Sequence, residues 1–136
     1  MARIPRRPAP DPETLKGVVR SFAYAWEGLR YAWRSQRNFR IEAYLALLAL
    51  AAAAWLGVDP VPVLLLILVV LTLELLNTAL EAAIDLTSPD PHPLAKAAKD
   101  TSAAAVLVAS VLAAAIGAWL FVPPLLEKLR AYGKIP

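Results

Sequence analysis

The sequence predicts an all-α integral membrane protein, in which three membrane-spanning helices follow an amphipathic helix at the membrane surface. Of the 136 residues, 59% are hydrophobic and only 18% are charged, a composition too apolar for an ordinary soluble domain. Long apolar runs occur in three places, each long enough to cross a bilayer as a helix. The chain has no cysteine, which excludes disulfide frameworks, zinc–thiolate sites and thiol nucleophiles.

The first part of the chain changes character twice. Residues 1–13 are basic and proline-rich, and we expect a disordered tail there because the segment has no apolar surface to bury. Residues 14–136 then form a single membrane domain. Between 14 and 37, aromatic and aliphatic residues recur at helical spacing while basic residues fill the opposite face. This pattern predicts the surface helix.

The three spans are predicted at residues 41–58, 61–86 and 103–122. The first span is rich in alanine, and small residues allow membrane helices to approach closely. The second is purely apolar in its first turns and carries polar residues in its last three. The third has no charged residue and Ser110 as its only hydroxyl. Pro123 and Pro124 are expected to end it, because proline interrupts helical hydrogen bonding.

Basic residues are distributed unevenly around these spans. Nine of the 14 Lys and Arg precede residue 41, two lie between the second and third spans, and three follow the third span. The positive-inside rule therefore places the N-terminus and the 87–102 segment in the cytoplasm. The same placement argues against nucleic acid as a partner, despite the net charge of +3.

One face of the second span carries three carboxylates and an amide. Glu74, Asn77, Glu81 and Asp85 are three or four residues apart, so a helix aligns them in one stripe, which Thr78 shares. An ionised side chain at bilayer depth costs on the order of 3 kcal/mol on insertion scales. Neighbouring acids also repel each other unless a cation or protons lie among them. The stripe is therefore predicted to be a functional site.

Hard oxygen ligands beside lysines favour chemistry on phosphates. Carboxylate and amide oxygens suit Mg²⁺, which completes its coordination shell with substrate phosphates. Lys96 and Lys99 follow on the same side of the membrane, and a carboxylate off the metal is able to accept a proton from a hydroxyl. The sequence contains no GxxxxGK[ST], GxGxxG, HExxH or GxSxG motif, which argues against P-loop, Rossmann, metalloprotease and serine-hydrolase sites.

Four stretches of sequence carry a resemblance to a known family. They are Glu74-Leu75-Leu76-Asn77-Thr78-Ala79-Leu80-Glu81-Ala82-Ala83-Ile84-Asp85, then Ala95-Lys96-Ala97-Ala98-Lys99-Asp100, with Tyr24-Ala25-Trp26-Glu27-Gly28-Leu29-Arg30 and Arg37-Asn38-Phe39-Arg40 in support. In this order they resemble the prokaryotic diacylglycerol kinase family, trimeric lipid kinases of the bacterial inner membrane. The resemblance extends over about residues 16–122.

The resemblance implies a role for each matching residue. Glu74 would be the general base that takes the proton from the lipid hydroxyl, and Glu81 would ligate Mg²⁺. The residues implied to contact ATP are Tyr24, Asn77, Glu81, Asp90, His92, Lys99 and Asp100. Those implied to face the lipid substrate are Arg30, Trp33, Asn38, Phe39, Arg40 and Glu42, together with Glu74. The resemblance also implies a homotrimer with sites composed between subunits.

One position departs from the family pattern. The family usually has a second metal-binding Glu three residues before the Phe of the Asn-Phe-Arg motif, and here that position holds Gln36. An amide is able to ligate a metal but carries no charge, so Gln36 and Glu42 both remain candidates for the second ligand. Residues 37–40 and 92–96 look more like the undecaprenol kinase branch of the family than the diacylglycerol branch.

Three functional hypotheses follow. The favoured one is ATP- and Mg²⁺-dependent phosphorylation of a membrane lipid alcohol at the cytoplasmic face, with undecaprenol ahead of diacylglycerol. The alternative is a small intramembrane proton or cation carrier that uses Glu74, Glu81 and Asp85 as a relay, although the first half of that span has no acid. A non-catalytic membrane subunit is the third, and it predicts tolerance of Glu74→Gln, since an amide still forms hydrogen bonds.

Overall fold

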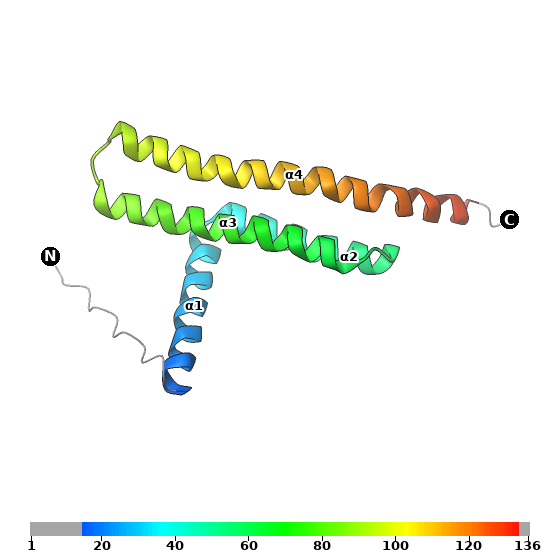
Figure 1. Ribbon diagram of the computed structural model, residues 1–136, viewed down its shortest axis with the longest axis horizontal. Helices are drawn as coiled ribbons and strands as arrows, with labels where there is room; N and C mark the ends of the chain where they lie inside the picture. Colours follow the sequence, from blue (N-terminus) through cyan, green and yellow to red (C-terminus); the bar gives the residue numbers. More distant parts are fainter. Residues whose placement is uncertain (1–14, 134–136) are drawn as a thin grey trace. The chain divides into compact units, whose positions relative to one another are not determined.

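The computed structural model describes residues 15–133, and this part of the chain contains four helices and no strand. They are α1 (Leu15–Ser35), α2 (Arg37–Leu56), α3 (Pro60–Thr87) and α4 (Pro93–Tyr132), as labelled in Figure 1. The tail expected at 1–13 lies outside the described residues. α2, α3 and α4 are each long and apolar enough to cross a membrane. The predicted all-α fold with three candidate membrane spans is therefore confirmed.

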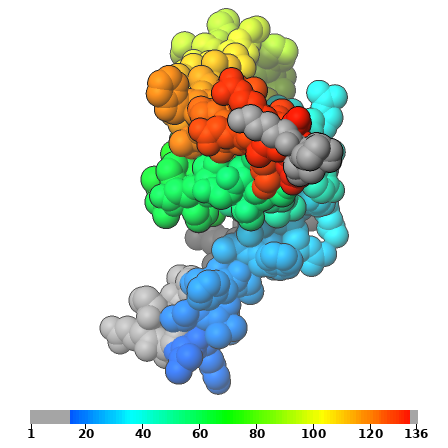
Figure 2. Space-filling model, turned by 90° about the vertical axis from the view of Figure 1, so that its right-hand side faces the viewer, coloured from blue at the N-terminus to red at the C-terminus, as the bar shows by residue number. Residues whose placement is uncertain are grey.

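The chain divides into two compact units, which meet at Gln36. The first described element, α1, belongs to one unit, and its location at a membrane surface stays a prediction. The other unit contains α2, α3 and α4, which all contact one another. α3 and α4 run side by side in opposite directions and are joined by a short connection (Figure 1). Figure 2 looks toward the end of this unit at which α4, in orange and red, packs over α3, in green.

The turn between α2 and α3 follows from its sequence. Gly57 ends α2 with a positive φ of 72°, a conformation that glycine adopts without strain. Asp59 begins α3, where its Oδ1 accepts a hydrogen bond of 3.0 Å from the backbone N–H of Val61. Pro60 occupies the first helical position, where its missing N–H costs nothing. The chain therefore reverses direction within three residues.

Burial in the α2–α4 unit is the inverse of that in a soluble protein. Large apolar side chains such as Leu65, Leu107 and Trp119 are exposed, whereas the buried polar residues are Glu74, Asn77 and Thr78 on α3. An apolar exterior around a polar interior is stable when hydrocarbon is the solvent, because lipid tails then cover the outer surface. The burial pattern independently supports a multi-pass membrane protein.

The break between α1 and α2 differs from the expected boundaries. α1 ends at Ser35, and α2 begins at Arg37, four residues before the predicted start of the first span. Between them Gln36 is extended, with φ −106° and ψ 116°. No proline or glycine marks this point in the sequence. The side chain of Gln36 instead makes a tertiary hydrogen bond to α3, which local sequence patterns do not encode.

The expectation that Pro123 and Pro124 end the third span is wrong. α4 continues through both to Tyr132. The proline φ is helical, so each proline removes one backbone hydrogen bond without forcing the helix to stop. Beyond them, the Lys128 ammonium donates to the backbone carbonyl of Trp55 and lies 4.4 Å from the centroid of its ring. This contact with the end of α2 holds the last turns of α4 in place.

Candidate active site

The acidic stripe on α3 runs from water into the protein interior. Asp85 lies at the exposed end, Glu81 is half-buried one turn earlier, and Asn77 and Glu74 are only 8% and 2% exposed. The Thr78 hydroxyl donates to the backbone carbonyl of Glu74 at 2.8 Å, so it is used within its own helix. A small molecule that enters from the exposed end would therefore meet successively drier carboxylates.

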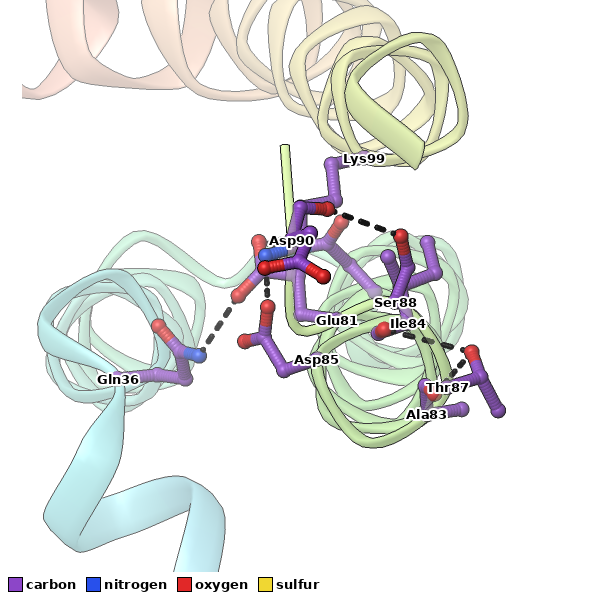
Figure 3. A network of polar contacts seen from close by, with 10 residues as sticks. Gln36, Glu81, Ala83, Ile84, Asp85, Thr87, Ser88, Asp90 and Lys99 are labelled. Atoms are coloured by element: carbon purple, nitrogen blue, oxygen red, sulfur yellow. Dashed lines mark hydrogen bonds and ion pairs between the residues drawn. The ribbon is translucent and has the colours of Figure 1, made fainter. Parts of the chain in front are cut away.

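Two amides hold the Glu81 carboxylate between helices. Gln36 Nε2 donates to Glu81 Oε2 at 3.1 Å, and Asn77 Nδ2 donates to Glu81 Oε1 at 3.0 Å. The carbonyl oxygen of Asn77 accepts in turn from the Ser102 hydroxyl of α4 at 2.5 Å. Figure 3 shows the Gln36 amide pointing across to Glu81. This cluster connects the start of α2 with α3 and α4, and it fixes the orientation of the carboxylate.

An ion pair connects α3 and α4 at the water-exposed end of the stripe. Lys99 donates to Oδ1 of Asp85, and the two side chains are 35% and 67% exposed, as Figure 3 also shows. A second pair, Lys96 with Asp100, lies one turn apart on α4 and is more exposed. Lys99 is thus the lysine that the fold brings to the acidic stripe, where its ammonium is available to a phosphate group.

A family model described as prokaryotic diacylglycerol kinase matches residues 23–121, which include the whole stripe and both lysines. The chain belongs to this family. It is a lipid kinase, and membership of a kinase family entails ATP as phosphate donor.

Relatives carry the names of two lipid kinases. A diacylglycerol kinase of Synechocystis sp. is 47% identical over 119 residues, which is 85% of this chain and 68% of the relative. A diacylglycerol kinase of Escherichia coli K12 is 40% identical over 99 residues, or 71% of this chain and 81% of the relative. An undecaprenol kinase of Bacillus subtilis is 38% identical over 114 residues, or 82% and 93%. The carrier alternative finds no support in these comparisons.

In this kinase, Gln36 rather than Glu42 is the residue that hydrogen-bonds Glu81. Glu42 lies on α2 between α3 and α4, where its Oε1 is 3.5 Å from the Ser110 hydroxyl. Its Oε2 is buried and accepts no hydrogen bond within the described residues. Of the two residues considered as the second ligand, only Gln36 has a demonstrated contact with the acidic cluster.

The connection between α3 and α4 carries Asp90 and His92, both expected to contact ATP. The Nδ1 of His92 accepts a hydrogen bond of 3.2 Å from the backbone N–H of Leu94, so the imidazole caps the start of α4. The backbone carbonyl of Asp90 accepts from the Ser88 hydroxyl at 3.2 Å. Both side chains are exposed at the open end of the unit. Their contacts with ATP stay predictions.

The residues expected to face the lipid fall into two groups. Asn38, Phe39 and Arg40 lie in the first turn of α2, where Phe39 is buried and Arg40 is half-buried. Arg30 and Trp33, like the ATP-contact candidate Tyr24, lie on α1 in the other unit. The structure describes α1 by itself, so the roles of these three side chains also stay predictions.

Sequence reasoning assigned no role to the two serines of α4 that contact the polar groups. Ser102 lies within hydrogen-bond distance of Asn77 and of the Lys99 carbonyl, and Ser110 contacts Glu42. Ser110 stood out in the sequence as the single hydroxyl of an apolar span. Ser102 had a weaker signal, its place three residues after Lys99 on the same helical face.

Proposed function

We propose that this kinase transfers the γ-phosphate of ATP to a lipid alcohol at the cytoplasmic face of the bacterial inner membrane. The carrying observation is the stripe itself, with a buried Glu74 at one end and the Lys99–Asp85 pair at the other. ATP is polar and reaches the exposed end from water, whereas a lipid hydroxyl reaches the buried end from the bilayer. A site with these two entrances suits phosphate transfer between the two phases.

The residues supply the groups that such a transfer requires. Glu74 accepts the hydroxyl proton as the lipid oxygen bonds to the γ-phosphorus. The bond from that phosphorus to the β–γ bridging oxygen breaks, and ADP leaves with this oxygen. Lys99 neutralises phosphate charge, and catalysis otherwise depends on positioning. Asn77, Asp90, His92, Asp100 and Tyr24 are proposed as further ATP contacts.

The donor set fits a Mg²⁺ ion that is held largely by ATP. No group of three His, Cys, Asp or Glu able to hold a metal occurs among residues 15–133. Glu81 provides one carboxylate and Gln36 an amide next to it, and Mg²⁺ commonly takes one or two protein carboxylates with substrate phosphates. We propose that Glu81, assisted by Gln36, binds this ion, which would neutralise charge on the phosphates.

Replacing the amide with a second carboxylate should increase the response to Mg²⁺. In Gln36→Glu, two carboxylates would face each other where a hydrogen bond of 3.1 Å now forms, and their repulsion is worth at least about 1 kcal/mol at contact distance. We expect a lower melting temperature without Mg²⁺ and a Mg²⁺ requirement for ATP turnover roughly tenfold lower. Thermal denaturation in detergent across Mg²⁺ concentrations measures the first effect.

The matched control for this change is Gln36→Met, which removes the amide and adds no charge. It should destabilise the protein equally with and without Mg²⁺. A Gln36→Glu variant whose melting temperature ignores Mg²⁺ would show that no ion binds beside Glu81.

For the lipid, we propose undecaprenol ahead of diacylglycerol. The support is the likeness of residues 37–40 and 92–96 to the undecaprenol branch, while two of the relatives above are named diacylglycerol kinase. We also propose a homotrimer with a cytoplasmic N-terminus, in line with the excess of Lys and Arg before residue 41.

The deciding experiment measures phosphate transfer from labelled ATP to each lipid in detergent micelles. We expect product from both alcohols and a higher kcat/KM for undecaprenol. A higher kcat/KM for diacylglycerol would reverse the preference. Folded protein that phosphorylates no lipid alcohol would overturn the proposed function.

A further inference from the structure

An apolar groove lies between α2, α3 and α4, next to the acidic stripe. Its volume is about 390 Å³, and it is partly open rather than fully enclosed. Small residues line it from both α2 and α4: Ala46, Ala49, Ala52, Ala113, Ala114 and Gly117. A Cβ built at Gly117 meets nothing within 4 Å. The space exists because the residues around it have little or no side chain.

The groove is continuous with the buried end of the stripe. Val63, Ile67 and Val70 line it from α3, and Glu74 follows Val70 at the next helical interval of four residues. Offsets of three and four residues keep all of them on one helical face. A molecule lying in the groove therefore points one end at the proposed catalytic base.

Two polar side chains, Glu42 and Ser110, are the exceptions in an otherwise apolar lining. Glu42 Oε1 lies 3.5 Å from the Ser110 hydroxyl, and Glu42 Oε2 is the buried oxygen without a hydrogen-bond donor. Buried polar atoms in proteins are nearly always paired. The missing partner is a donor such as a hydroxyl group, carried by a molecule whose remaining part is apolar.

The width of the groove restricts that molecule to one hydrocarbon chain. The three helices contact one another pairwise, and packed helices have axes about 8–10 Å apart. The space enclosed by three such helices holds one chain along its length, not two side by side. A polyprenol has one chain behind its hydroxyl, whereas diacylglycerol has two.

We infer that this groove binds the chain of a single-chain lipid alcohol within one protomer, with Glu42 as the acceptor that guides the hydroxyl toward Glu74. The inference rests on the proposed function and gives it a physical basis for substrate choice. The groove favours polyprenols because of its width and its lone acceptor.

Filling the groove should separate long substrates from short ones. In Gly117→Leu and Ala113→Leu, the added side chains occupy space where the polyprenol chain would lie. We expect the KM for undecaprenol to rise at least about tenfold, while kcat and KM for 3-methylbut-2-en-1-ol, which is too short to reach Gly117, stay unchanged. Binding of radiolabelled undecaprenol to the purified protein should weaken in parallel, without any turnover.

Ala115→Leu is the matched control, because Ala115 is exposed on the same helix and does not line the groove. It should leave both substrates unaffected. Unchanged undecaprenol binding in the two groove variants would overturn the inference, and would point instead to coverage by another subunit. An equal rise in KM for diacylglycerol would overturn the single-chain selectivity. Wild-type protein that phosphorylates neither long nor short alcohols would contradict the proposed function, while the binding measurement would still decide the groove.

Discussion

Glu74→Gln is expected to reduce lipid phosphorylation by a factor of about 10² to 10⁴, the usual contribution of a general base. The substitution keeps the volume and the hydrogen-bonding capacity of a side chain that is only 2% exposed, but the amide is unable to take a proton from the lipid hydroxyl. We expect kcat to fall while the KM for ATP changes little, because ATP is proposed to bind at the other end of the stripe. Steady-state kinetics with undecaprenol and diacylglycerol measure both quantities.

Glu127→Gln is the matched control for this loss. Glu127 lies on the exposed last turns of α4, outside the proposed site, and its substitution should leave kcat unchanged. A Glu74→Gln enzyme that retains full activity would remove Glu74 as the base. It would then favour a role for this residue in helix packing alone.

The main features of the fold were predictable because they depend on local composition. Apolar length predicted the three spans, and helical spacing placed Glu74, Asn77 and Glu81 on one face, where the structure buries Glu74 and Asn77. These features follow from the period of the helix and from the solvent, so no tertiary information is required.

Features that depend on contacts between helices were not predictable in the same way. The break at Gln36 and the continuation of α4 beyond Pro124 both accompany side-chain contacts with other helices. Local propensity opposed the second and gave no signal for the first. The pairing of Lys99 with Asp85, and of Ser102 with Asn77, likewise depends on the register between α3 and α4, which sequence spacing alone does not determine.

Lys99→Met is expected to raise the KM for ATP by roughly 10- to 100-fold. A hydrogen bond to a charged group contributes about 1.5–3 kcal/mol, and each 1.4 kcal/mol corresponds to a factor of ten. Methionine keeps the length of the side chain but removes the ammonium that pairs with Asp85 and that we propose meets the phosphates. ATP binding, followed by titration calorimetry in detergent, and steady-state kinetics measure the loss.

The comparison with Lys96→Met decides between a phosphate contact and a general membrane anchor. Both lysines lie on the same turn of α4 and contribute equally to the positive charge on that side of the membrane. Lys96 pairs with Asp100 on its own helix and is 78% exposed, whereas Lys99 is 35% exposed and reaches across to α3. If charge alone matters, the two substitutions should impair the enzyme equally. A large effect confined to Lys99 would follow only if its position beside the acidic stripe brings it to ATP.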